Sequence, residues 1–255
     1  MSLILDHPHT DAVKIIAFLK ETFQKQGKKK AVIAVSGGID SALSLTLLTQ
    51  ALPVESIYPI LLPYDNQSID DAQAICEFNE IPNENVTVVN IKSAVDQISK
   101  ADISPVRKGN IMARVRMIYV YDLAKKLDAL VVGTENKSEQ YLGYFTRFGD
   151  GASDIEPIQQ LYKTQVRQLV EHLQLPKIFL EKTPSAGLWD QQTDEDELGF
   201  TYEQADQVIQ QYIDDHKEAK FIVIDSSDSG EVVKKVIAQI ESQKFKHEVP
   251  YVLSD

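Results

Sequence analysis

Apolar residues change their spacing repeatedly along the chain, and these changes divide it into strand-like and helix-like segments. Four short apolar runs, each about as long as a buried strand, occupy residues 31–35, 54–62, 86–91 and 129–132. Helical spacing of apolar residues follows the first three runs, near 40–51, 68–80 and 110–127. Strands that alternate with helices are typical of right-handed crossovers, which place helices on both faces of a parallel sheet. The pattern therefore predicts an α/β fold.

Further helices and loops flank this alternation. Residues 11–26 predict a first helix, whose apolar side chains share one face: Val13, Ile16, Leu19 and Phe23. Beyond the fourth run the strand pattern ends, and segments punctuated by Gly and Pro surround a helical pattern at 159–173. The apolar run that begins at Phe221 lies between two helical patterns. We expect it to connect two helices rather than to form a strand.

The sequence Ser-Gly-Gly-Ile-Asp-Ser at 36–41 stands between the first apolar run and the helical pattern that follows it. A strand, a glycine turn and a helix N-terminus bring free backbone N–H groups together beside the positive end of a helix dipole, which suits a phosphate. Ser36 and Ser41 can add hydroxyl contacts to the phosphate oxygens, and Asp40 can hold a divalent cation. No lysine follows the second glycine, so this is not a GxxxxGK[ST] loop. The alternative is an ordinary strand-to-helix turn in which Asp40 and Ser41 only cap the helix.

Composition narrows the class of protein. The 255 residues are 43% hydrophobic, enough to bury the core of one α/β domain with small additions. A net charge of −12 disfavours binding to nucleic acid or to anionic membranes. Because the sequence shows no membrane-spanning run and no secretory signal, we expect a cytoplasmic protein. The single cysteine, Cys76, excludes an intrachain disulfide, and the five histidines lack the spacing of a zinc site.

Longer motifs carry a family resemblance. Two segments, "LLPYDNQSIDDAQ" and "KGNIMARVRM", and two long stretches, "GTENKSEQYLGYFTRFGDGASDIEPIQQLYKTQVRQL" and "KTPSAGLWDQQTDEDELG", follow the glycine turn. The turn resembles the pyrophosphate loop of the ATP pyrophosphatases, and the four motifs together resemble the ammonia-dependent NAD synthetases of that group. The match extends from about Val32 to the C-terminus.

The resemblance implies a more detailed architecture than the apolar pattern does. It implies a single domain over residues 1–255, built on a doubly wound, mainly parallel five-stranded sheet flanked by helices. The nucleotide-binding core would cover about 28–140, and a helical, loop-rich part that binds substrate would cover about 141–255.

The same resemblance implies a reaction. ATP adenylates the nicotinate carboxylate of deamido-NAD, ammonia attacks the acyl adenylate, and NAD, AMP and pyrophosphate are released. Mg²⁺ is the implied cofactor, and a homodimer is implied with the helix of Arg114 at its two-fold interface. We expect the ammonia to come from solution or a separate partner, because the chain has no room for a glutaminase domain and Cys76 is a poor nucleophile candidate.

The resemblance also implies roles for individual residues. Asp40 and Lys163 are the implied catalytic residues, and Asp40 and Glu139 are the implied Mg²⁺ ligands. A lysine ammonium beside phosphates would stabilise the charge of the leaving pyrophosphate. The implied ATP contacts are Ala34, Val35, Ser36, Gly37, Gly38, Ile39, Asp40, Ser41, Thr134, Lys163 and Ser185. The implied deamido-NAD contacts are Arg114, Arg147, Asp154 and Lys246.

Plainer interpretations exist for several of these residues. Outside the motif, Lys163 would be a surface lysine and Glu139 a solvated acid at a helix start. The acidic run at 194–197 indicates a solvated loop, and Trp189 suits either a core or a lid over the nucleotide. Two alternatives remain for the whole chain: another adenylating enzyme, such as a GMP synthetase-like amidotransferase, and a nucleotide-binding regulator that performs no chemistry.

The C-terminal tail departs from the family pattern. Relatives commonly end with His-Lys-Arg-x-x-Pro, whereas this chain has Phe245, Lys246 and His247 when it is aligned on Pro250. Only Lys246 is retained. An aromatic ring at position 245 can stack where an imidazole would, but it cannot make the imidazole's hydrogen bond.

Overall fold

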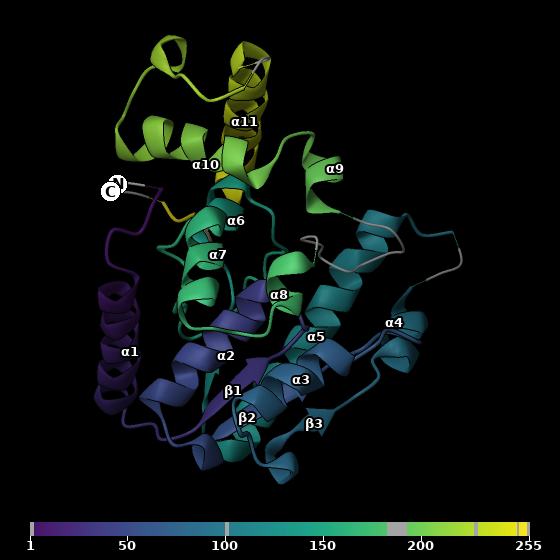
Figure 1. Ribbon diagram of the computed structural model, residues 1–255. Coiled ribbons are helices and arrows are strands. Elements are labelled where there is room, and N and C mark those ends of the chain that lie inside the picture. Colours follow the sequence, from purple (N-terminus) through teal and green to yellow (C-terminus); the bar gives the residue numbers. More distant parts are fainter. Residues whose placement is uncertain (1–2, 100–101, 183–192, 227–228, 249, 254–255) are drawn as a thin grey trace.

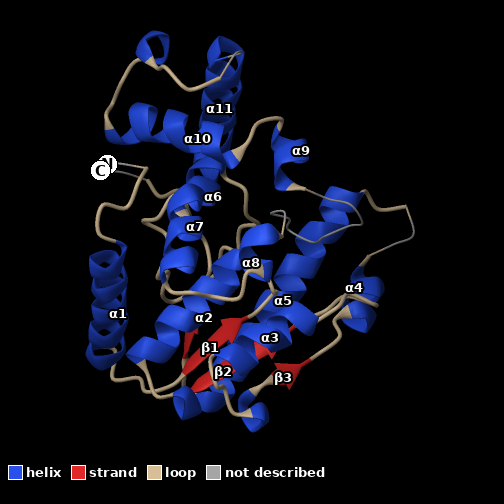
Figure 2. Ribbon diagram, in the orientation of Figure 1, coloured by secondary structure: helices blue, strands red, loops and turns tan. Residues whose placement is uncertain are grey.

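A parallel sheet lies among helices in the computed structural model, which describes residues 3–99, 102–182, 193–226, 229–248 and 250–253 (Figure 1). Within these residues the sheet has four strands in the order β3-β2-β1-β4, drawn red in Figure 2. The strands are β1 (Ala31–Ala34), β2 (Ile57–Leu61), β3 (Thr87–Val88) and β4 (Leu130–Val132). Every pairing is parallel, and central β1 pairs Ala31 with Ile57 on one side and with Leu130 on the other.

The α-helices of the described residues fall into two sets. The N-terminal set comprises α1 (Pro8–Lys25), α2 (Ile39–Ala51), α3 (Asp70–Phe78), α4 (Lys92–Ile98) and α5 (Pro105–Leu127). The C-terminal set comprises α6 (Lys137–Leu142), α7 (Lys163–His172), α8 (Ile178–Glu181), α9 (Asp194–Leu198), α10 (Tyr202–Ile209) and α11 (Ser229–Gln243). None of the helices described is long and apolar enough to cross a membrane.

Helix α5 illustrates how the sequence starts and ends an element. The Ser104 hydroxyl accepts a hydrogen bond from the Arg107 N–H at 3.4 Å, and Pro105 occupies the first helical position, where its missing N–H costs nothing. Asp128 ends the helix in the left-handed conformation with φ of 57°.

Both faces of the sheet are covered, as the alternation of elements predicts. Ala31 and Ile33 of β1 pack into one buried cluster with α1, α2, α3 and α7. Val32, which points to the opposite face, packs with α4 and α5. A third cluster joins α6, α10 and α11, and Figure 1 shows α10 and α11 beyond α6 and α7, away from the sheet. The doubly wound α/β prediction is thus confirmed.

Beyond β4, the described residues add only a single bridge to the sheet. Ile155 pairs in parallel with Val132, and the Gly133 N–H donates to the Ile155 carbonyl at 2.8 Å. Pro157 follows two residues later and lacks an N–H, so the ladder cannot continue along this edge. The described residues therefore form a sheet of four strands, not the five that we expected.

Two further predictions concern helices. In α1 the buried side chains are Ala12, Ile15, Leu19 and Phe23, while Val13 is 49% exposed. The expected face was therefore rotated, because α1 packs against both α2 and α7. The apolar run at 221–226 connects α10 to α11 as expected, and its Ile222 and Ile224 are buried without joining the sheet.

Candidate active site

The glycine turn after β1 leads directly into a helix. Gly38 is the N-cap of α2, which begins at Ile39. Gly37 has φ of +77°, and a Cβ there would lie 2.8 Å from the Cβ of Asp71. Both the backbone conformation and the lack of space therefore require glycine at this position.

Hydroxyls hold the turn in shape. The Ser41 hydroxyl donates to the Gly38 carbonyl at 3.0 Å and accepts from the Ser36 N–H at 3.3 Å. The Gly38 N–H donates to the Ser36 hydroxyl at 3.2 Å. Of the neighbours implied as ATP contacts, Val35 and Ile39 are buried and Ala34 is partly buried. The segment thus gathers N–H groups and hydroxyls at the carboxyl end of the central strand, where ligands of such sheets bind.

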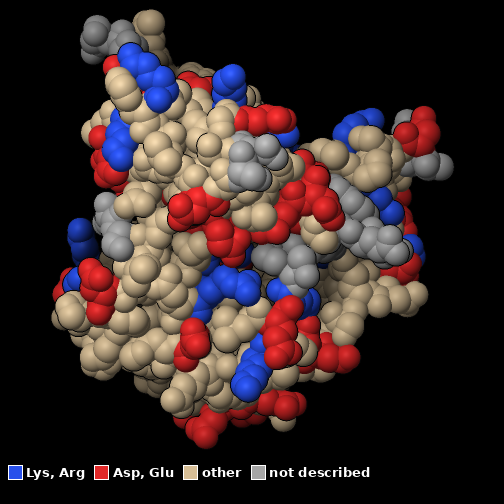
Figure 3. Space-filling model, turned by 45° about the horizontal axis from the view of Figure 1, so that its top comes forward, with Lys and Arg blue, Asp and Glu red and all other residues tan. Residues whose placement is uncertain are grey.

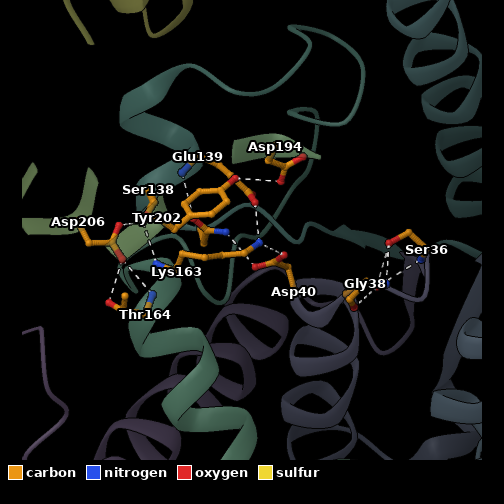
Figure 4. A network of polar contacts seen from close by, with 12 residues as sticks. Ser36, Gly38, Asp40, Ser138, Glu139, Lys163, Thr164, Asp194, Tyr202 and Asp206 are labelled. Atoms are coloured by element: carbon orange, nitrogen blue, oxygen red, sulfur yellow. Dashed lines mark hydrogen bonds and ion pairs between the residues drawn. The ribbon is translucent and has the colours of Figure 1, made fainter. Parts of the chain in front are cut away.

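Lys163 joins the two carboxylates that were expected to bind a cation. Its Nζ lies 2.5 Å from Asp40 Oδ2 and 2.9 Å from Glu139 Oε1 (Figure 4). The three residues come from the first turns of α7, α2 and α6, so three helix N-termini meet here. The Lys163 side chain is only 3% exposed, which excludes the surface-lysine interpretation.

The charges of this triad depend on one another. Burial alone would lower the pKa of Lys163, but attraction to Asp40 and Glu139 outweighs burial, so the pKa is raised and the ammonium stays charged. Burial raises the pKa of Glu139, although the nearby ammonium opposes that change. The site therefore holds a fixed positive charge between carboxylates beside the glycine turn.

Asn136 links the carboxylate of Asp40 to the backbone of Glu139. Its Nδ2 donates to Asp40 Oδ1 at 2.9 Å, and its Oδ1 accepts the Glu139 N–H at 3.0 Å. Asn136 is therefore both the N-cap of α6 and a support for Asp40. The spacing Asn-x-x-Glu is a helix-start pattern in the sequence, but nothing in it indicated the contact with Asp40.

Asp206 of α10 holds the N-terminus of α7. Its Oδ2 accepts the Thr164 N–H and the Thr164 hydroxyl, each at 2.9 Å, and its Oδ1 accepts the Ser138 hydroxyl (Figure 4). The Ser138 Oγ in turn accepts the Lys163 N–H at 2.8 Å. Burial raises the pKa of Asp206 to about 6, against the opposing effect of these hydrogen bonds. We did not single out Asp206 from the sequence. The only sign of its role there is an acidic residue among the apolar positions of a helix.

The Tyr202 ring covers one side of Lys163, and Asp194 forms a hydrogen bond with Tyr202. The Lys163 Nζ lies 5.1 Å from the centre of the Tyr202 ring, whose hydroxyl donates to Asp194 Oδ2 at 3.1 Å. Asp194 is 4% exposed and begins α9. The interpretation of 194–197 as a solvated loop was therefore wrong in two respects, because the segment forms α9 and Asp194 is buried beside its tyrosine partner. Asp196 and Glu197 are exposed, as expected.

The arginines implied as deamido-NAD contacts lie together. The Arg114 Nε donates to the Arg147 carbonyl at 3.3 Å, and both side chains are accessible on the surface beside α5. The Arg147 guanidinium lies 5.0 Å from the centre of the Phe245 ring, which stands where relatives carry histidine. The aromatic substitution in the tail thus stacks on an arginine of the same group.

The Lys246 side chain forms hydrogen bonds with backbone carbonyl groups. Its ammonium donates to the Gly143 carbonyl and, at 2.9 Å, to the Phe145 carbonyl. Burial lowers the pKa of Lys246, because a charged ammonium is less well solvated there. Lys246 therefore holds the loop after α6 in place next to Arg147.

The remaining predicted residues are more dispersed. Thr134 is half-buried just after β4, at the same end of the sheet as the glycine turn. Asp154 lies against the middle of β4, where its Oδ2 accepts the Val131 N–H at 2.8 Å. Ser185 and Trp189 lie outside the described residues.

Known proteins are similar to this chain in sequence and fold. The family model described as NAD synthase matches residues 12–250. An NH3-dependent NAD+ synthetase from Fusobacterium nucleatum is 38% identical over 242 residues, which are 94% of this chain and 93% of the relative.

Two solved structures match the fold of this chain over nearly their whole length. The NMN synthetase from Francisella tularensis has a TM-score of 0.82 and 33% identity, covering 97% of this chain and 99% of that one. The NH3-dependent NAD synthetase from Campylobacter jejuni has a TM-score of 0.82 and 26% identity, covering 98% of this chain and 100% of that one. With a glycine turn, a buried lysine and paired carboxylates at the sheet's carboxyl end, and with matches over almost its full length, this chain belongs to the NAD synthase family.

Proposed function

We propose that this chain is a ligase that amidates deamido-NAD with free ammonia, at the expense of ATP, to give NAD, AMP and pyrophosphate. The observation that carries the proposal is the Lys163 ammonium, held between Asp40 and Glu139 next to the glycine turn. Family membership supports the reaction, and the buried charge supports catalysis over mere nucleotide binding, because a regulator has no need of a desolvated lysine there.

The chemistry proceeds in two steps. The nicotinate carboxylate attacks the α-phosphorus of ATP and displaces pyrophosphate, which leaves an acyl adenylate. Ammonia then attacks the acyl carbon, the bond to the AMP oxygen breaks, and the surplus proton passes to solvent. The N–H groups and hydroxyls of the glycine turn position the phosphates, and Lys163 offsets the negative charge that develops on the leaving pyrophosphate.

The residues present suit Mg²⁺. Asp40 and Glu139 would hold the ion, because both offer hard carboxylate oxygens and both already approach one cationic nitrogen. No group of three or more His, Cys, Asp or Glu side chains is arranged for a metal within the described residues. A cation supported by two carboxylates, phosphate oxygens and water is the usual arrangement for Mg²⁺ in nucleotide enzymes, where it neutralises phosphate charge.

We also propose that the acid substrate binds beside a two-fold dimer interface. Arg114 lies on α5, and Ile118, four residues further along the same helix, is 59% exposed. An exposed apolar residue on one face of a long helix suits contact with a second copy of the chain. The forked guanidinium groups of Arg114 and Arg147 suit the phosphate oxygens of a dinucleotide.

A second acid substrate is favoured by one observation. The solved structure from Francisella tularensis is named an NMN synthetase, which implies that its amidated product is a mononucleotide. The altered tail at Phe245 lies against Arg147, where recognition of the substrate is expected to occur. Amidation of nicotinate mononucleotide is therefore the alternative activity for this chain.

One experiment separates these possibilities. The purified chain is incubated with Mg-ATP, ammonium and one acid at a time, deamido-NAD or nicotinate mononucleotide, and the products are identified by mass spectrometry. We expect NAD and AMP to form in equal amounts with deamido-NAD, and glutamine not to replace ammonium. A preference for the mononucleotide would establish the alternative activity, and the absence of AMP with either acid would refute the proposed function.

A further inference from the structure

A second lysine contacts the glycine turn. Lys182 follows α8, and its ammonium lies 3.3 Å from the Gly37 carbonyl oxygen. The same ammonium forms an ion pair with Asp71, at the start of α3. Because Asp71 packs directly against Gly37, the lysine, the aspartate and the turn form one group of contacts.

Lys182 and Lys163 line the same cavity. It has a volume of about 240 Å³ and is lined by residues of α7, α8, α9 and α10 together with Lys182. Its charged lining residues are the cations Lys163, Arg167 and Lys182 and the acids Glu181, Glu195 and Glu203. On the face drawn in Figure 3, basic side chains gather near the centre and acidic side chains surround them.

The three cations differ in how freely they can take a ligand. Lys163 is buried between two carboxylates, and the Arg167 Nη2 donates to the Leu180 carbonyl at 3.0 Å. Lys182 is 47% exposed, and its partner Asp71 is 26% exposed. An ion pair that solvent reaches contributes little to the stability of the fold. Lys182 can therefore exchange its partner Asp71 for a phosphate at little cost in free energy. A hydrogen bond from an ammonium to a phosphate is charge-assisted and strong.

We propose that Lys182 is a further substrate-binding residue, whose ammonium leaves Asp71 and binds the β- and γ-phosphates of ATP and afterwards the released pyrophosphate. A phosphate seated on the glycine turn lies beside Gly37, which the ammonium already touches. Lys182 and Lys163 then offset charge on one pyrophosphate group from two different segments of the chain. The inference rests on the proposed function in one respect, because it requires ATP to bind at the glycine turn. It does not depend on whether deamido-NAD or nicotinate mononucleotide is the acid substrate.

Binding of inorganic pyrophosphate to the full chain tests the inference without any acid substrate. Isothermal titration calorimetry is performed on the wild type, Lys182→Gln and Lys177→Gln, with AMP as a second ligand. Lys177 is an exposed lysine that precedes α8, so its loss changes the net charge equally. We expect Lys182→Gln to weaken pyrophosphate binding about tenfold or more, and Lys177→Gln to change it less than about twofold. AMP, which lacks the β- and γ-phosphates, should bind all three proteins equally.

Asp71→Asn provides the complementary measurement. If Asp71 only occupies Lys182 until phosphate arrives, its neutral variant should bind pyrophosphate at least as tightly as the wild type does. Unchanged pyrophosphate binding in a folded Lys182→Gln protein would overturn the inference, as would equal losses in Lys182→Gln and Asp71→Asn, which would make the pair a structural part of the turn. If the chain fails to amidate either acid while Lys182→Gln still loses pyrophosphate binding, only the proposed function fails.

Discussion

At the scale of single residues, the site depends on Lys163, whose positive charge is balanced by the carboxylates of Asp40 and Glu139. Lys163 is buried, so removal of either carboxylate partner leaves a positive charge with half its compensation in a poorly solvated place. The same two carboxylates are the proposed Mg²⁺ ligands. Substitution at either position therefore affects both the ammonium and the cation.

We predict that Asp40→Asn and Glu139→Gln each lower kcat about a hundredfold, or about 3 kcal/mol of transition-state stabilisation. Both changes keep the side-chain volume, so the fold should persist. Steady-state rates measured over a series of Mg²⁺ concentrations check this, with Glu231→Gln, an exposed residue of α11, as the control. Near-normal turnover and an unchanged Mg²⁺ requirement in both variants would place the cation elsewhere.

Glu135 is a second residue whose ionisation the fold controls. It is 8% exposed, and its Oε1 has no hydrogen-bond partner. Burial raises its pKa to about 9, with smaller contributions from Glu156, Glu139 and Asp150 and an opposing one from Lys246. Between the ordinary pKa of 4.5 and this value, the folded protein holds a proton that the unfolded chain releases. Wild-type stability should therefore fall as the pH rises through this window.

Glu135→Gln should remove that pH dependence, because an amide does not ionise. We predict that the variant is more stable than the wild type at pH 8, with a gain that grows by at most about 1.4 kcal/mol per pH unit and vanishes near pH 4. Melting temperatures measured by circular dichroism at the two pH values check this. A gain of equal size at both would contradict it, and Glu84→Gln on the surface should show no gain at either.

At the scale of elements, three helix N-termini converge on the site, and α10 fixes the position of one of them. Asp206 accepts hydrogen bonds from the N-terminal turn of α7 and, through Ser138, reaches the backbone of Lys163. The C-terminal helices thus position Lys163, the proposed catalytic side chain, next to the glycine turn.

We predict that Asp206→Asn lowers kcat about tenfold while the KM for ATP changes less than about threefold. The amide cannot accept all the hydrogen bonds that the carboxylate accepts, so Lys163 shifts, whereas the glycine turn, the proposed ATP site, stays intact. Initial rates at varied ATP check this split, with exposed Asp215→Asn as the control. A purely structural role would instead lower the melting temperature and leave kcat per folded molecule unchanged.

At the scale of the whole molecule, the exposed face of α5 is a candidate contact surface between two copies of the chain. Ile118 is 59% exposed on α5, and Phe148, in the loop that carries Arg147, is also 59% exposed. Both lie near the arginines proposed to bind the acid substrate. A two-fold contact through this surface would bring two substrate sites next to the interface.

We predict that the wild type is a dimer and that Ile118→Asp is a folded monomer with a higher KM for the acid substrate. A buried pair of like charges at a two-fold contact is strongly unfavourable. Light scattering at micromolar concentration measures the mass. Val223→Asp, at an exposed position between α10 and α11, should remain dimeric. A wild-type monomer with full activity would refute the proposed assembly.

Much of this protein could be predicted from local sequence. Alternating apolar runs and helical patterns determined the α/β class, because burial of both sheet faces requires apolar strands between amphipathic helices. The glycine pair at 37 and 38 predicted the turn, and the structure explains position 37, where a positive φ and a close approach to Asp71 exclude a side chain. Long motifs determined the family and named Asp40, Glu139 and Lys163, which the fold brings together.

Other features depend on contacts between segments distant in sequence, and only the tertiary structure decided them. Beyond β4 the described residues add one bridge and no further strand, the buried face of α1 is turned toward α2 and α7, and Asp194 is buried beside Tyr202. Asp206 reaches α7 and Lys182 reaches Gly37 across the fold. Local patterns report which side chains seek burial, but the partner that satisfies a buried charge or an orphan N–H is set by packing, so it cannot be read from spacing alone.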